Sequence, residues 1–383
     1  MKIFLRIPPG ADCGVGYYRQ WLPLNTAKKK GELDFRCNKF TWGERSDESD
    51  NPMPEPSVEE LSKDAKWADL LYFSRNDVPQ YIAQAGGLGD FHTKPIVLDI
   101  DDNVQATRPY NPGYRSFHPN SPNMAWNIKS LGVFDAITVS TENLKEYYSQ
   151  YTDADKIYVC PNSLDWERRD KSLAKKYTSE LYKKDKDEIR IGWSGSAAHW
   201  ENLKHIEKPI ADILKKYPKA TFYYTGLFGD LFQDPEIKDR VKTVSWAGLK
   251  DWSDRNVEMN LDIAVAPLAD NMFNRAKSNL RILEFGSAGY PVIATPVEPY
   301  RTFEDGVEIM HATEKDEWFE ALDELVGSKE RREYFGNNLS KKVRKDYDID
   351  KNYKIWTDAM KDIQKKYAKK LKKFVKEQKK ATK

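Results

Sequence analysis

The sequence predicts an α/β protein with two Rossmann-like domains, and three observations predict this class. The chain has 383 residues, a length typical of two domains. Short apolar runs, which suit buried parallel strands, alternate with helical patterns in both halves. Polar loops with small residues follow several of these runs, where open α/β sheets bind their ligands. We therefore expect two domains that face each other across a cleft.

The composition excludes several classes of protein. Hydrophobic residues make up 39% of the chain, enough for two cores, whereas 32% charged residues and the lack of a long apolar run exclude a membrane-spanning helix. The three cysteines show neither zinc nor disulfide spacing, and the five histidines show no metal spacing. We therefore expect a cytoplasmic protein without a bound metal.

The charge is distributed unevenly. Residues 361–383 contain eleven lysines and two acidic residues, a local balance of +9. Because the whole chain carries +2, the other residues carry −7. This basic end follows a helical pattern that begins at Lys351. It can be a solvated helix end, contact an anionic membrane surface or bind nucleic-acid phosphates.

In the N-terminal half, the apolar runs predict strands over residues 2–7, 33–40, 68–73, 94–100, 136–140 and 156–160. The first is followed by a glycine-rich turn that opens a helix and contains Gly14, Gly16 and Arg19. Residues 46–57 are rich in Pro, Asp and Glu and are predicted to form a mobile surface loop.

Three carboxylates, Asp99, Asp101 and Asp102, occur where the fourth strand ends. They can form a metal site that bridges a diphosphate, an acceptor site that orients or deprotonates a hydroxyl, or a helix N-cap with solvated charge.

A long segment, residues 108–127, combines aromatic rings with cations. Tyr110, Tyr114, Phe117 and Trp126 alternate with Arg108, Arg115 and His118. Such a segment suits stacking on sugars or bases, and a loop packed by its own rings is the alternative.

In the C-terminal half, strands are predicted over residues 189–196, 220–225, 241–246, 261–266, 292–294 and 306–311. The first runs into small residues, among them Gly195 and Ser196, whose amides can approach a phosphate. The polar loop 270–279 opens a helix that Gly289 and Pro291 end. Lys277 beside the helix start and Glu284 within it suit a nucleotide diphosphate, with the acid on a ribose hydroxyl.

The strings KSNLRILE (277–284) and GYPVIA (289–294) resemble the donor site of retaining GT-B glycosyltransferases of the large family-four group. FDAITVSTENL (134–144) and IYVCPNSLD (157–165) resemble the end of the first GT-B domain. The common pattern has a first Glu where this chain has Ala276, so the chain resembles a phage- or bacterial-type subset with Lys-Ser instead. Many relatives also carry an Arg where this chain has Trp193 and Ser194.

The resemblance implies a role for each candidate residue. Lys277 and the amides of Ser278, Asn279 and Leu280 would hold the diphosphate, aided by Gly195 and Ser196, and Glu284 would hold the ribose. Backbone near Trp246 and Gly248 would meet the nucleobase. Gly14, Gly16 and Arg19 would lie near phosphate and acceptor, and Asp101 or Asp102 would contact the acceptor. Because GT-B enzymes bind diphosphate without an essential metal, the acceptor interpretation of these aspartates is preferred.

The resemblance also implies domain limits and an activity. We expect an acceptor domain over 1–165, a linker over 166–188, a donor domain over 189–350, and helices over 351–383 that return to the first domain and end in the basic tail. The activity would be transfer, with retention, of a sugar from a nucleotide-sugar, by default a UDP-sugar, without a further cofactor. The acceptor hypothesis is a hydroxymethylated base in DNA. The alternatives are a cell-surface glycan or lipid acceptor, or a non-catalytic protein that binds nucleotide-sugar or nucleic acid.

Overall fold

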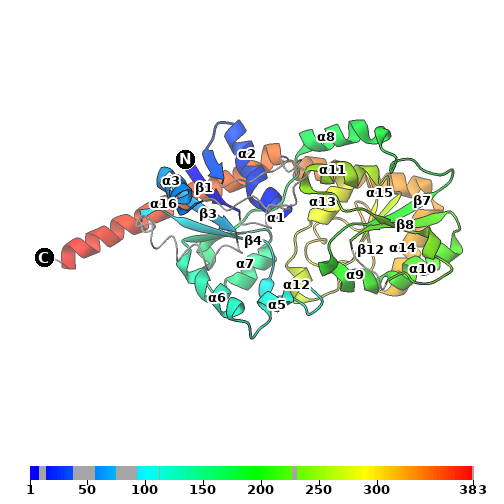
Figure 1. Ribbon diagram of the computed structural model, residues 1–383, viewed down its shortest axis with the longest axis horizontal. Coiled ribbons are helices and arrows are strands. Elements are labelled where there is room, and N and C mark those ends of the chain that lie inside the picture. Colours follow the sequence, from blue (N-terminus) through cyan, green and yellow to red (C-terminus); the bar gives the residue numbers. More distant parts are fainter. Residues whose placement is uncertain (8–13, 38–56, 75–92, 112, 227–230, 382–383) are drawn as a thin grey trace. The chain divides into compact units, whose positions relative to one another are not determined.

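The computed structural model describes residues 1–7, 14–37, 57–74, 93–111, 113–226 and 231–381. The chain forms two compact units, each with its own sheet (Figure 1). Unit 1 comprises Met1–Asn103, Pro119–Asn162 and Ile349–Lys383, and unit 2 comprises Val104–His118 and Ser163–Asp348. Both sheets are parallel, and helices cover their faces, so the predicted fold class of two Rossmann-like domains is confirmed.

The sheet of unit 1 has the strand order β2-β1-β3-β4-β5-β6. Its strands are β1 Lys2–Arg6, β2 Asp34–Cys37, β3 Leu70–Ser74, β4 Ile96–Ile100, β5 Ala136–Val139 and β6 Ile157–Val159. Every residue of β3, β4 and β5 is buried, because helices cover both faces of the sheet. The strands predicted for unit 1 are all present, with ends that differ from the prediction by one or two residues; β3 extends one residue further, to Ser74, and residues 38–40 lie outside the described part.

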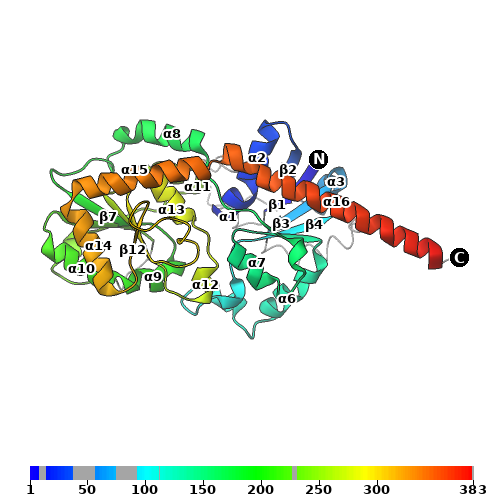
Figure 2. The ribbon, with the colours of Figure 1, turned by 180° about the vertical axis from the view of Figure 1, so that it is seen from behind.

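The α-helices of unit 1 are α1 Gly14–Gly16, α2 Leu22–Lys29, α3 Val58–Trp67, α6 Pro122–Ser130, α7 Glu142–Tyr148 and α16 Ile349–Ala381. The last of these packs along α2 and brings the end of the chain onto the first sheet's unit, as Figure 2 shows from behind. The buried Trp356 ring packs with Cys160 and donates a hydrogen bond of 3.1 Å from its Nε1 to the carbonyl oxygen of Arg19.

The sheet of unit 2 has the strand order β9-β8-β7-β10-β11-β12. Its strands are β7 Ile189–Trp193, β8 Ala220–Thr225, β9 Val241–Val244, β10 Ile263–Ala266, β11 Val292–Ala294 and β12 Met310–His311. Its α-helices are α5 Tyr114–Phe117, α8 Trp166–Lys175, α9 Trp200–His205, α10 Glu207–Lys216, α11 Leu249–Glu258, α12 Met272–Arg275, α13 Leu280–Ser287, α14 Lys315–Gly327 and α15 Lys329–Asp346.

Helix α13 is held close to α15 by a glycine. A Cβ built on Gly286 would lie 2.7 Å from Cγ of Leu339, a distance that side chains do not tolerate, so the two helices approach because Gly286 has no side chain. The helix ends as predicted: Gly289 has a φ of +84°, the left-handed conformation that glycine adopts at low cost.

Two segments differ from the sequence-based expectation. Residues 166–188, expected as a linker, contain the helix α8, which belongs to unit 2 and packs on α11. The aromatic segment 108–127, expected as a loop, contains α5 and the start of α6, where the hydroxyl of Ser121 accepts a bond from the amide of Met124 at 3.1 Å. The loop expected at 46–57 lies outside the described residues except for Ser57, which caps α3.

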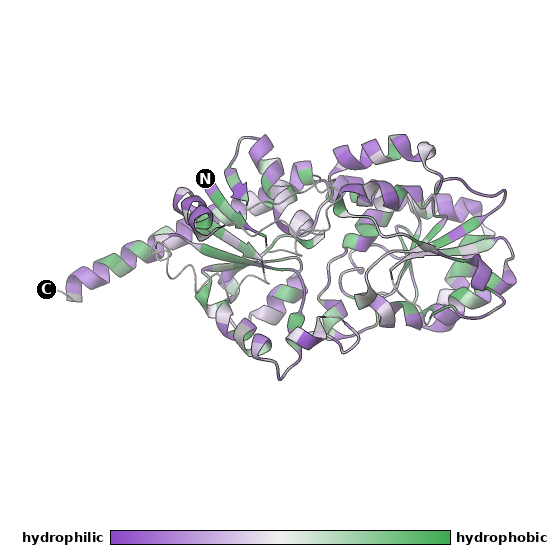
Figure 3. Ribbon diagram, viewed as in Figure 1, coloured by the Kyte–Doolittle hydropathy of each residue, from purple (hydrophilic) through white to green (hydrophobic). Residues whose placement is uncertain are grey.

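The hydropathy colouring of Figure 3 shows the apolar strands of both sheets in green among helices of mixed character. Within the described residues, no helix is both long and apolar enough to cross a bilayer.

Candidate functional site

The site of unit 2 begins with the order of its strands. Neighbouring strands β7 and β10 pair through Ile191 with Ile263 and Gly192 with Ala264. The chain leaves them toward opposite sides of the sheet, since β8 and β9 follow on one side and β11 and β12 on the other. Ligands of open α/β sheets bind at such a switch point, beyond the carboxyl ends of the strands. Gly195 and Ser196 follow β7, and the predicted loop 270–279 follows β10.

Arg281, in the first turn of α13, reaches the small-residue loop after β7. Its guanidinium carbon lies 4.8 Å from the centre of the Trp193 ring. A Cβ built on Gly195 would lie 2.7 Å from Nη2 of Arg281 and 2.5 Å from the Trp193 ring, so glycine is required here. Nη1 of Arg281 is buried and has no hydrogen-bond partner among the described residues. An anion is the ligand that satisfies a buried guanidinium donor.

Lys277 and His199 complete a cluster of basic groups around Arg281. Nζ of Lys277 lies 4.4 Å from the centre of the Phe273 ring. Burial, followed by the charges of Arg281 and Lys277, lowers the pKa of His199 well below its usual value. The imidazole is therefore neutral at pH 7, and its Nδ1 lies 2.9 Å from Nδ2 of Asn202. Two permanent cations near the half-buried His199 ring give this loop a positive potential.

The N-terminus of α13 adds backbone donors to this cluster. Asn279, at the N-cap position, makes no capping bond with its side chain. Its Nδ2 instead donates to the hydroxyl of Tyr347 at 3.0 Å. The side chain of Asn279 therefore does not compete with an anion for the amides at the start of the helix, and the helix dipole favours negative charge there.

Glu284, one turn further along α13, is oriented by an indole. The side chain is only 8% exposed, and its Oε1 accepts a hydrogen bond of 2.7 Å from Nε1 of Trp252 on α11. The carboxylate also interacts electrostatically with Arg281, so the acid and the basic cluster are neighbours.

Trp246 provides a flat, accessible surface beside this acid. Its ring is 62% exposed and stacks on Trp252, with centroids 5.6 Å apart and planes 26° apart. Gly248, two residues later, precedes α11, and a Cβ built on it would meet no atom within 4 Å. Since Trp252 contacts both Trp246 and Glu284, one residue connects an exposed aromatic surface to the buried carboxylate.

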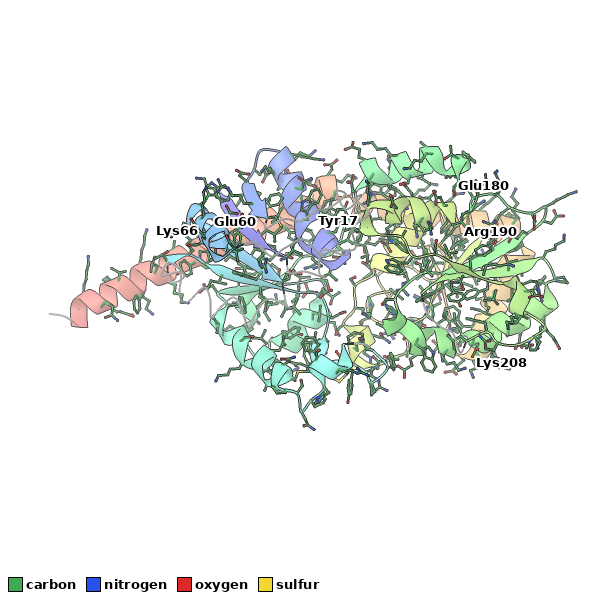
Figure 4. The ribbon with its side chains drawn as sticks, in the orientation of Figure 1. Tyr17, Glu60, Lys66, Glu180, Arg190 and Lys208 are labelled. Carbon is green, nitrogen blue, oxygen red and sulfur yellow. The ribbon has the colours of Figure 1, made fainter. Side chains whose placement is uncertain are left out.

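The glycine-rich turn of unit 1 places its arginine inside the core. After Gly14 and Gly16 the chain forms a π-helical turn, Tyr17–Trp21, whose first residue is labelled in Figure 4. Arg19 is 1% exposed and donates to both carboxylate oxygens of Asp99, at 2.9 and 3.3 Å, and to Oδ1 of Asn162 at 3.1 Å. This pairing engages the guanidinium within unit 1, which favours a structural role for Arg19; its predicted contact with phosphate or acceptor stays untested.

The Arg19–Asp99 pair belongs to a larger buried polar network. Asp99 also accepts hydrogen bonds from Thr138 at 2.7 Å and Tyr72 at 3.2 Å. Burial raises the pKa of Tyr72 well above its usual value and that of the Cys160 thiol to about 12, so both groups stay neutral at pH 7. Of the three aspartates singled out in the sequence, Asp99 is thus a core residue.

Asp101 and Asp102 lie just beyond β4 and are both half-buried. Their backbone is fixed: the carbonyl of Asp101 accepts from the hydroxyl of Ser140 at 3.4 Å, and that of Asp102 from the hydroxyl of Tyr148 at 3.1 Å. Both residues lie at the carboxyl-end edge of the sheet, where Gly14 and Gly16 follow β1.

The first part of the aromatic segment, up to His118, belongs to unit 2, and residues 119–127 belong to unit 1. Nη2 of Arg108 lies 3.7 Å from Oε1 of Glu201 on α9. Burial and a hydrogen bond with Glu201 raise the pKa of Tyr110. Glu201 therefore forms an ion pair with Arg108 and a hydrogen bond with the hydroxyl of Tyr110.

Three residues of the unit 2 site were not predicted from the sequence: Arg281, His199 and Trp252. Arg281 lies inside the motif from Lys277 to Glu284, in the first turn of α13, and a cation at the start of a helix beside a predicted diphosphate site was an available signal. His199 and Trp252 carry no local signal, because only the pairing of β7 with β10 and the packing of α11 bring them to α13.

Among the residues that the structure describes, no group of three or more His, Cys, Asp and Glu side chains could hold a metal ion.

No protein-family model and no curated protein matches the chain. Solved structures do match. HepE of Anabaena in complex with UDP and glucose is 14% identical, with 94% of this chain and 100% of that chain covered and a TM-score of 0.66. A glycosyltransferase from Rickettsia africae is 13% identical, with 94% and 98% covered and a TM-score of 0.65. UDP-GlcNAc 2-epimerase from Neisseria meningitidis, bound to UDP-GlcNAc, is 14% identical, with 94% and 99% covered and a TM-score of 0.51.

At such low identities the likeness shows the fold. The chain has the GT-B architecture of two Rossmann-like domains, and in unit 2 this architecture holds a basic cluster at the switch point of the sheet.

Proposed function

We propose that this protein is a glycosyltransferase that moves a sugar from a UDP-sugar to an acceptor hydroxyl with retention of configuration. The observation that carries the proposal is the buried Nη1 of Arg281, without a partner among the described residues, in a basic cluster beside the carboxylate of Glu284. Diphosphate and ribose need these two kinds of group close together. The UDP and UDP-sugar complexes of structural neighbours support uracil as the base.

In this mechanism the oxygen of the acceptor hydroxyl forms a bond to the anomeric carbon while the bond between that carbon and the diphosphate oxygen breaks. The hydroxyl proton passes to the departing diphosphate, on which negative charge develops in the transition state. Lys277, Arg281 and the amides of residues 278–280 stabilise that charge, and the loop of Gly195 and Ser196 lets the diphosphate approach the backbone. Arg281 supplies a cation in the region where the resembling family carries an Arg after the first strand of this domain.

The nucleoside would lie toward α11. The carboxylate of Glu284, oriented by Trp252, accepts from the ribose hydroxyls, and the exposed face of Trp246 with the open backbone at Gly248 takes the base. Asp101 would orient the acceptor hydroxyl. Retention rests on the resemblance of the KSNLRILE motif.

A UDP-release assay separates this proposal from its rivals. A transferase releases UDP from its donor, slowly with water and faster with acceptor. The epimerase among the structural neighbours shows that this fold also serves UDP-sugar epimerisation, and an epimerase would change the sugar of UDP-GlcNAc, which proton NMR detects. A binding protein would release nothing from any donor. Absence of UDP release from a panel of UDP-sugars, in spite of UDP binding, would therefore refute transfer.

The same panel identifies the donor. Thermal shift with UDP-, GDP- and ADP-sugars should show the largest rise in melting temperature for one UDP-sugar, because binding to the folded state stabilises it by mass action. Turnover should survive EDTA, in keeping with the absence of a metal requirement that the resemblance implies. Loss of turnover with EDTA and recovery with Mn²⁺ would instead support a metal at Asp99 and Asp101.

For the acceptor, the hypothesis from the sequence is a hydroxymethylated base in DNA, and the alternative is a glycan or lipid hydroxyl. Transfer of radiolabelled sugar to hydroxymethylcytosine-containing DNA, with unmodified DNA of the same sequence as the control, tests the first. Label in a lipid extract or glycan fraction, and none in DNA, would replace it with the second. Because Glu201 interacts with Arg108 and Tyr110, fewer groups of residues 108–127 are available to bind a DNA base.

A further inference from the structure

The last turns of α16 have no role in the proposed transferase site. Up to Lys370 the helix contacts unit 1: Lys366 donates to the hydroxyl of Tyr158 at 2.9 Å, and Lys370 to Oδ1 of Asp135 at 3.0 Å. Residues 372–380 are all exposed. Nine further exposed residues in a helix that continues past its packing partner leave a surface for a partner outside the protein (Figure 1).

The last turns of this helix are amphipathic. Leu371, Phe374 and Val375 follow the spacing i, i+3, i+4, which places them on one side. Lys372, Lys376 and Lys380 follow the spacing i, i+4, i+8 on the opposite side. Phe374 is 57% exposed and Val375 43% exposed. Figure 3 shows green patches among purple positions over these turns.

We infer that the end of α16, residues 371–380, binds an anionic membrane surface, with the apolar edge at the headgroup boundary and the lysines against the lipid phosphates. A helix with a strongly cationic face and apolar residues such as Phe and Leu on the other is the form that lies in a bilayer interface. Each lysine near an anionic leaflet adds to the attraction. This inference goes beyond the proposed function and does not depend on it.

Two other occupants fit less well. A second copy of the same helix would bring lysine against lysine, with Glu377 as the one acidic residue after Asp362 to offset them. A nucleic acid would use the lysines but leave Phe374 and Val375 in water, because backbone phosphates offer no apolar surface. The segment also contains lysine and no arginine. Lysine is a hydrated point charge suited to diffuse attraction, whereas arginine favours bidentate phosphate recognition.

The test is flotation of the full chain with vesicles of phosphatidylcholine alone or mixed with phosphatidylglycerol. The chain should float with the mixed vesicles and less with added salt. Two double variants separate the contributions: Lys372→Glu with Lys376→Glu, and Phe374→Ser with Val375→Ser. Each should weaken binding about tenfold or more. The matched control is Lys238→Glu with Lys341→Glu, the same charge change at exposed lysines of unit 2, which should bind like wild type.

Circular dichroism and melting temperature verify that every variant folds, as expected for exposed positions. Equal flotation of the tail variants and wild type would overturn the inference. So would failure of the wild-type chain to float with anionic vesicles. A third refuting outcome is binding of duplex DNA that the lysine variant loses and the Phe374→Ser, Val375→Ser variant keeps, without vesicle binding; it would assign the tail to nucleic acid.

Discussion

Glu284→Ala is expected to weaken UDP binding about thirtyfold. In the structure Glu284 is 8% exposed, and its carboxylate accepts a hydrogen bond of 2.7 Å from Nε1 of Trp252. The carboxylate is therefore held in place before the ligand binds. A hydrogen bond to a charged group contributes about 1.5–3 kcal/mol. A loss of about 2 kcal/mol at 25 °C corresponds to a factor of about thirty in Kd. The variant also leaves the indole donor unpaired, which costs about 1–3 kcal/mol of stability.

Calorimetric titration with UDP and with uridine measures this effect, and Trp252→Phe is the matched control. Phenylalanine keeps an aromatic ring beside Trp246 but cannot donate a hydrogen bond to Glu284. The carboxylate therefore remains, but its orientation is no longer fixed. We expect a smaller loss in Trp252→Phe, and in Glu284→Ala similar factors for UDP and uridine, because both ligands carry the ribose. A folded Glu284→Ala protein with wild-type affinity for both ligands would refute the assignment of Glu284.

Three further predictions concern other parts of the molecule. Arg281→Ala should weaken UDP binding about tenfold or more and leave uridine binding unchanged, because it removes a charged donor of about 1.5–3 kcal/mol to phosphate; equal losses for both ligands would contradict this role. The pKa of His199 is lowered in the folded protein, so stability should be complete above the unfolded value of about 6.5 and decline as pH falls below it. In urea unfolding at several pH values, the free energy of unfolding of His199→Gln should fall less below pH 6.5 than that of wild type. Identical pH profiles of the two proteins would contradict the lowered pKa of His199. Arg19→Met should cost about 3–5 kcal/mol in urea unfolding, since it leaves Asp99 buried without its cation; normal stability with lost ligand affinity would restore Arg19 as a ligand-binding residue.

Features set by local sequence were predictable, and those set by distant packing were not. The strands followed from apolar runs such as Leu70–Ser74, and the end of α13 followed from Gly289. The burial of Arg19 depends on Asp99, eighty residues away, so a glycine-rich turn gave no sign of it. The helix α8 was read as a linker because its sequence is charged, although Asp165 accepts from the amide of Arg168 at 3.1 Å as a typical N-cap.

The candidate site likewise contains residues that local sequence predicts and residues that only distant packing brings together. Lys277 and Glu284 share one short motif, so their proximity to the start of α13 could be predicted. His199 reaches the same place only because β7 pairs with β10, seventy residues further along the chain. Trp252 reaches it through the packing of α11, and its bond to Glu284 spans 32 positions.

The return of α16 to unit 1 has a consequence for how the chain can fold during synthesis. Unit 2 apart from residues 104–118 is one continuous stretch, Ser163–Asp348, whereas unit 1 needs both ends of the chain. The first sheet leaves the ribosome early, but Trp356, which covers Cys160, is made almost two hundred residues later. Until then, part of the apolar surface of the first sheet has no cover. A chain that stops before Ile349 should therefore contain a foldable second half and an aggregation-prone first half.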